Sequence, residues 1–135
     1  MALINRGKSF RWGMLMLVVL GGCRTFHPTA AERTVLAHSY LERAARLARS
    51  GQTERAMAAA DMAVSFDSSY LPARLFRGAL RLQEGKVEEA LEEYEEAVRL
   101  AEWPRVAPSD RAMARAGRAA CYALLGRAAE SASDY

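Results

Sequence analysis

A repeat with a period of 34 residues is the feature that most constrains how this chain folds. Gly51 and Gly85 lie 34 residues apart, and small or apolar residues recur at equal offsets around both glycines. The paired positions are Ala44 and Gly78, Ala56 and Ala90, Ala63 and Ala97, Val64 and Val98, and Phe66 and Leu100. A partial third copy surrounds Gly126. Periods of about 20 to 50 residues are typical of solenoids, in which each repeat packs only against its neighbours.

Helical signals fill each copy of the repeat. Apolar residues recur at the spacing of one helix face. These stripes are Leu41, Ala44, Ala45 and Ala48; Leu75, Gly78, Ala79 and Leu82; and Ala116, Ala119, Ala120 and Ala123. A glycine follows each stripe, as glycine does just beyond a helix end, and Thr29 with Glu32 matches a capping box. We predict helices over 30–50, 53–67, 71–84, 87–101 and 109–125, and a stub from 127.

The period and the paired helices resemble the tetratricopeptide repeat (TPR), a family of antiparallel helix pairs. The matching residues are Ala44, Gly51, Ala56 and Ala63 in the first copy, and Gly78, Gly85, Ala90, Tyr94 and Ala97 in the second. The sequence departs from the family early in the first helices, where Tyr40 keeps the expected aromatic residue but Arg74 and Arg115 replace it. The resemblance implies an all-α fold, a short α-solenoid of about two and a half TPR-like repeats, over residues 30–135.

The first 22 residues have the layout of a cleavable signal peptide. Basic residues precede an apolar run, 14–20, that is shorter than the roughly 20 residues needed to span a bilayer. Leu20-Gly21-Gly22-Cys23 resembles the bacterial lipobox. That resemblance implies cleavage before Cys23, lipid on its sulfur, and a short tether over 23–29. An ordinary signal peptide or a short buried helix is the alternative.

The net charge of +3 comes from this leader, whose basic residues are Arg6, Lys8 and Arg11. The rest of the chain holds 16 basic and 16 acidic residues. The charge is therefore no argument for a nucleic-acid partner.

No pattern for catalysis or cofactor binding is present. The histidines are His27 and His38, and the cysteines are Cys23 and Cys121, which do not make a zinc set. Neither a glycine-rich phosphate loop nor a nucleophile elbow occurs. We expect no enzyme, no cofactor, no metal and no small-molecule substrate. Cys121 is expected in a helical core, with a reactive thiol as the alternative.

One candidate binding surface is a row of arginines. Arg43, Arg77 and Arg118 each stand eight residues before a repeat glycine. On successive first helices such a row would grip a peptide that carries a carboxylate. The alternative interpretation is that arginines compensate the acidic helix 87–101, around which eight carboxylates fall between Glu84 and Glu102.

A second candidate surface follows from the incomplete third repeat. Its first helix would leave an apolar face uncovered at Ala116, Ala120 and Leu124, with Arg115 and Arg118 beside it. Exposed apolar patches mark association sites. A protein partner or a second copy of the chain would cover this face.

These features together predict a membrane-anchored TPR lipoprotein that acts as an adaptor or assembly factor in the bacterial envelope. It would bind a protein on the periplasmic side and reach the membrane through its lipid. Arg24 is not the aspartate that often holds such lipoproteins in the inner membrane, which favours the outer membrane. The first alternative is a shortened or degenerate structural lipoprotein with no specific ligand, and the second is a subunit of an enzyme.

Overall fold

The computed structural model describes residues 27–127, which form five helices and no strand. The helices are α1 (Ala30–Arg49), α2 (Thr53–Phe66), α3 (Leu71–Gln83), α4 (Val87–Ala101) and α5 (Pro108–Leu124). All five predicted helices are confirmed, with ends within one residue of those expected. The expected stub from 127 falls almost entirely outside the described residues, as do Cys23 and the leader.

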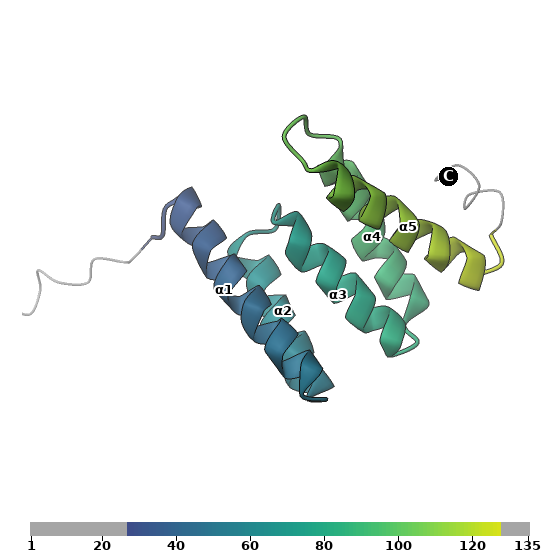
Figure 1. Ribbon diagram of the computed structural model, residues 1–135, viewed down its shortest axis with the longest axis horizontal. Coiled ribbons are helices and arrows are strands. Elements are labelled where there is room, and N and C mark those ends of the chain that lie inside the picture. Colours follow the sequence, from purple (N-terminus) through teal and green to yellow (C-terminus); the bar gives the residue numbers. More distant parts are fainter. Residues whose placement is uncertain (1–26, 128–135) are drawn as a thin grey trace, which may run out of the picture.

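The helices build a two-layered solenoid. α1 packs on α2 and α3 packs on α4 as two hairpins, and α5 adds the first helix of a third repeat. α1, α3 and α5 form one layer, and α2 and α4 lie behind it (Figure 1). The predicted all-α solenoid of TPR-like helix pairs is therefore confirmed.

The repeat glycines end the first helices in the same way. Gly51, Gly85 and Gly126 have φ values of 75°, 75° and 72°, in the left-handed region that glycine adopts without strain. The Gly51 N–H donates to the Ala48 carbonyl and the Gln52 N–H donates to the Leu47 carbonyl, both at 3.0 Å. Equivalent bonds close the other two turns. This is the Schellman arrangement that the glycine positions predicted.

The start of α1 is fixed by the predicted capping box. The Thr29 N–H donates to Glu32 Oε2 at 2.7 Å, and the Glu32 N–H donates to Thr29 Oγ1 at 3.3 Å. Both bonds satisfy backbone donors that the first turn would otherwise leave unpaired.

Small residues bring the helices close together. Ala44 on α1 and Ala56, Ala60 and Ala63 on α2 are fully buried. Because alanine adds only a methyl group, the two backbones approach closely, as the stripes of small residues predicted. Cys121 is also buried among core residues of α4 and α5, which confirms its predicted place.

One aromatic side chain joins α3, α4 and α5. Tyr94 of α4 is buried between Gly78 of α3 and Gly117 of α5. A methyl group built on Gly78 would lie 3.1 Å from the Tyr94 ring, and one on Gly117 would lie 2.2 Å from it. The absence of a side chain at Gly117 therefore allows the third repeat to pack on the second.

Candidate functional site

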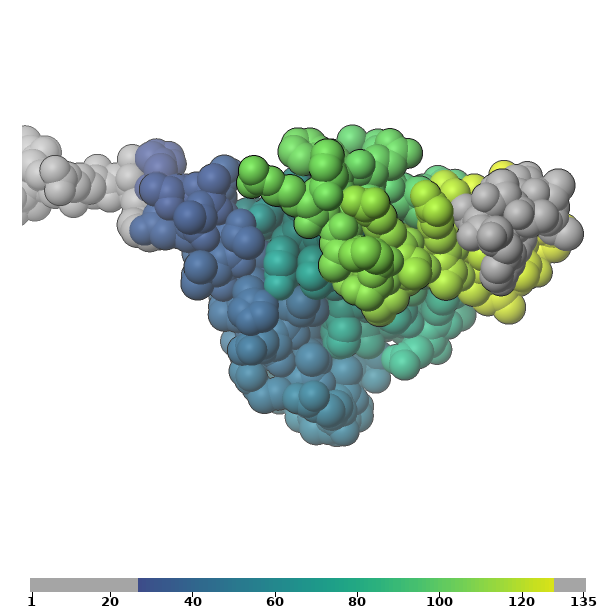
Figure 2. Space-filling view, turned by 45° about the horizontal axis from the view of Figure 1, so that its top comes forward, coloured from purple at the N-terminus to yellow at the C-terminus, as the bar shows by residue number. Residues whose placement is uncertain are grey.

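The layer of first helices carries a groove of about 390 Å³. α3 forms its floor, and α1 and α5 form its walls; in Figure 2, α3 is set back between the blue α1 and the green start of α5. The residues that line the groove are Leu41, Glu42 and Ala45 of α1, Pro72, Leu75, Phe76 and Ala79 of α3, and Asp110 and Met113 of α5. All three first helices contribute, so the groove exists only because the repeats stack.

The middle of the groove is apolar. Leu75 is buried beneath it, while Phe76 is half-buried and Ala79 is exposed at its surface. Met113, on the α5 wall, is 57% exposed. Methionine is unbranched and flexible, so its side chain adapts to different apolar ligands. The groove therefore offers an apolar surface that nothing within the described chain covers.

One end of the groove is acidic. Glu42 and Asp110 lie on opposite walls, on α1 and α5. Burial raises the pKa of Tyr70, and the charges of Glu42, Asp110 and Asp67 raise it further. The Tyr70 hydroxyl lies 2.8 Å from His38 Nδ1. Tyr70 directly precedes α3, so these groups gather where the floor of the groove begins.

Arg77 of the predicted arginine row is engaged within the fold. Its Nη2 donates to Glu93 Oε1 at 2.6 Å, and its Nη1 donates to Asp61 Oδ1 at 3.0 Å. Arg74 and Arg81 also pair with Glu93, at 3.3 Å and 3.8 Å. Glu93 is only 5% exposed. The stripe of three arginines on α3 thus pairs with a buried carboxylate of α4.

The other two arginines of the row lie elsewhere. Arg43 borders a shallow hollow of about 220 Å³ between α1 and α2, together with Arg55 and Met62. Arg118 of α5 is half-buried. The hydrogen bond to Glu95 raises the pKa of Tyr122, and the charge of Arg118 partly offsets this rise. None of the three arginines is among the described residues that line the groove. Their predicted role in binding a protein remains a prediction.

The free side of α5 is exposed as expected. Ala116 and Ala120 are exposed, and Leu124 is 66% exposed. Arg115 is exposed beside them. The binding role of this face remains a prediction.

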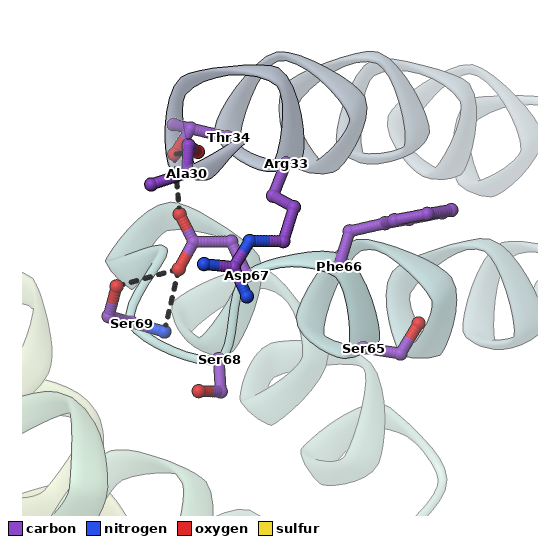
Figure 3. A pocket seen from close by; sticks show the side chains of 8 residues that line it. All are labelled: Ala30, Arg33, Thr34, Ser65, Phe66, Asp67, Ser68 and Ser69. Atoms are coloured by element: carbon purple, nitrogen blue, oxygen red, sulfur yellow. Dashed lines mark hydrogen bonds between the residues drawn. The ribbon is translucent and has the colours of Figure 1, made fainter. Parts of the chain in front are cut away.

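A polar hollow of about 360 Å³ lies between the start of α1 and the turn that joins α2 to α3. Figure 3 shows Asp67 at its centre, between Thr34 and Ser69. Asp67 accepts hydrogen bonds from Thr34 Oγ1 at 2.7 Å, from Ser69 Oγ at 2.6 Å and from the Ser69 N–H at 3.0 Å. These bonds join α1 to the turn between α2 and α3. The polar residues of this hollow therefore have a structural role.

Within residues 27–127, no group of three or more potential ligand side chains is arranged to hold a metal ion. In the same range, no helix combines the length and the apolar character needed to cross a bilayer. Burial raises the pKa of the Cys121 thiol, which keeps the thiol protonated and unreactive.

No family model matches the chain. No curated protein sequence matches it significantly. Among solved structures, the chain is similar to one described as the second TPR of Spaghetti (RPAP3) bound to the HSP90 peptide SRMEEVD. The two share 22% sequence identity at a TM-score of 0.67, over 78% of this chain and 90% of that chain. The chain therefore has the fold of a TPR domain.

Proposed function

We propose that this chain is a protein-interaction module that binds a segment of a partner protein in the groove of α1, α3 and α5. The observation that carries the proposal is the apolar surface that these three helices build together. Ligand sites are concave and mostly apolar, with a few polar groups that set orientation, and this groove has that composition. The solved neighbour was described with a peptide bound, which supports a peptide as the kind of ligand.

We further propose that the module works at a bacterial membrane. The support is the leader and the sequence Leu20-Gly21-Gly22-Cys23, which resembles a lipobox. Cys23 would carry lipid and the domain would face the periplasm as an adaptor or assembly factor, with the outer membrane favoured. Several acyl chains anchor a protein stably where one chain is only marginal.

The binding proposal is tested by a neutral polar substitution in the groove. Ala79→Gln would place an amide under an apolar ligand without adding charge, and an unpaired buried amide costs about 1–3 kcal/mol. Partner binding should weaken about tenfold. Ala58→Gln is the matched control, because Ala58 is exposed on α2 outside the groove. The measurement is stoichiometric co-purification from detergent-solubilised membranes, followed by a titration with the partner.

Each outcome of that experiment selects one interpretation. Loss of the partner in Ala79→Gln alone supports the groove. A partner retained in Ala79→Gln but lost in Ala120→Glu would move the contact to the free side of α5. The absence of any stoichiometric partner would favour the structural lipoprotein without a specific ligand.

A further inference from the structure

We propose that the groove selects a segment in which a lysine or arginine stands beside a bulky apolar residue. The cation would lie between Glu42 and Asp110, and the apolar side chain would cover Leu75 and Phe76. This inference rests on the proposed function, because it names the chemistry of the partner for the same groove.

The two carboxylates are placed to act on one ligand group. Glu42 comes from α1 and Asp110 from the first turn of α5, so they face the groove from opposite walls. Both charges act on the Tyr70 hydroxyl, which places both near the start of α3. A cation at this end therefore meets two negative charges at once, next to the apolar floor.

Among the described residues, these two charges are largely uncompensated. Asp110 takes part in none of the ion pairs found between described residues. Glu42 pairs with His38 at 3.5 Å and Arg46 at 4.0 Å, and all three side chains are more than half exposed. Exposed pairs of this kind contribute about 0–1 kcal/mol, so a partner's cation can displace them.

The same arrangement disfavours an acidic partner. None of the described residues that line the groove is basic. A carboxylate entering the acidic end would be repelled by Glu42 and Asp110, and would lose water without gaining a partner. The groove thus differs from the arginine-lined surface that the sequence suggested, and it fits the opposite charge.

The test uses the full chain in detergent and three fluorescein-labelled ten-residue peptides. The peptides share leucine, alanine and serine at eight positions and carry two lysines, two glutamates or two glutamines at the others. Fluorescence anisotropy measures their affinity. The lysine peptide should bind about tenfold more tightly than the glutamine peptide at low salt, and the glutamate peptide should bind most weakly. The preference should shrink as salt screens the charges.

Substitutions assign the preference to the two carboxylates. Asp110→Asn and Glu42→Gln should each weaken binding of the lysine peptide about fivefold, and should leave the glutamine peptide unchanged. Asp110→Lys leaves one charge of each sign at this end, because Glu42 remains, so it should abolish the preference for the lysine peptide over the glutamate peptide. Glu54→Gln is the control, because Glu54 is exposed on α2 away from the groove.

Failure of this inference can be told apart from failure of the proposed function. If the peptides bind equally well and Ala79→Gln weakens all three, the groove binds peptides but the charge preference is wrong. The same holds if Asp110→Asn and Glu42→Gln leave the lysine peptide unaffected. If no peptide binds, or if Ala79→Gln changes nothing, the inference and the groove's proposed role are both wrong.

Discussion

At the scale of single residues, the packing of the third repeat depends on the space around the Tyr94 ring. Gly117 and Gly78 hold the ring from two sides, and a methyl group on Gly117 would overlap it at 2.2 Å. A methyl group on Gly78 would lie 3.1 Å from the same ring, which is tight but is not an overlap. The two positions should therefore respond differently to the same substitution.

Gly117→Ala should lower the stability by about 1–2 kcal/mol, because overpacking outweighs the gain of about 1 kcal/mol from alanine in a helix. The melting midpoint, followed by circular dichroism, should fall by roughly 5–10 °C. Gly78→Ala is the matched comparison and should be close to neutral. Equal effects at both glycines would mean that the ring does not fill this space. In the double variant Gly117→Ala with Tyr94→Leu, the smaller side chain at position 94 should leave room for the alanine, so the cost of Gly117→Ala should be smaller than in the unmodified chain.

Residue-level features of this kind were only partly predictable from the sequence. The repeat pattern predicted close packing at Gly78 and Ala119, and the helical stretch around Cys121 predicted a core position for that thiol; all three residues are buried. It did not single out Gly117, because Gly117 has no equivalent in the repeat offsets and its role depends on the position of α5. Glu93 was also missed, since one of eight clustered carboxylates gives no local sign of burial. The sequence feature that could have indicated a buried carboxylate is the stripe of Arg74, Arg77 and Arg81 on the neighbouring helix.

At the scale of helices, the sequence predicts where each helix begins and ends, but it does not predict which face of the helix lines the groove. Caps and glycines act within one turn, so Thr29, Glu32 and the repeat glycines define the ends of helices locally. Which stripe faces the groove depends on how each helix is rotated in the stack. Leu75 and Phe76 line the groove while Arg77 turns toward Glu93, and this choice is made by contacts between helices.

Asp67 provides a test of how the first hairpin is joined to α3. Burial works against its ionisation, but hydrogen bonds from Ser69 and Thr34 outweigh burial and hold the pKa of Asp67 below its ordinary value of 3.8. Because the folded pKa is the lower one, ionised Asp67 stabilises the fold above about pH 4, and this stability is lost as the pH falls through the folded pKa.

Asp67→Asn should therefore cost about 1–2 kcal/mol at pH 7, because it weakens hydrogen bonds to a charged acceptor. The difference in the free energy of unfolding between Asp67→Asn and the unmodified chain should narrow toward pH 3. Urea unfolding at both pH values measures it. Ser68→Ala serves as the control, since Ser68 lines the same hollow without bonding Asp67. A pH-independent difference would contradict the role assigned to the carboxylate.

At the scale of the whole molecule, the proposed anchor would set the position of the domain at the membrane. The seven residues from Cys23 to Thr29 reach at most about 25 Å when extended. α1 begins directly after them, at Ala30. A lipid on Cys23 would thus keep the start of α1 near the membrane surface, and a partner bound in the groove would be held there too.

The anchor is tested through the mass and location of the chain in a Gram-negative bacterial host. Membrane-extracted protein should begin at Cys23 and carry added acyl mass, and separation of the two membranes should place it in the outer one. Cys23→Ser removes the sulfur that accepts the lipid, so this variant should keep its leader and gain no acyl mass. An unmodified chain that retains Met1, or a product cut elsewhere, would falsify the anchor. Neither result would bear on peptide binding in the groove, which involves only residues of α1, α3 and α5.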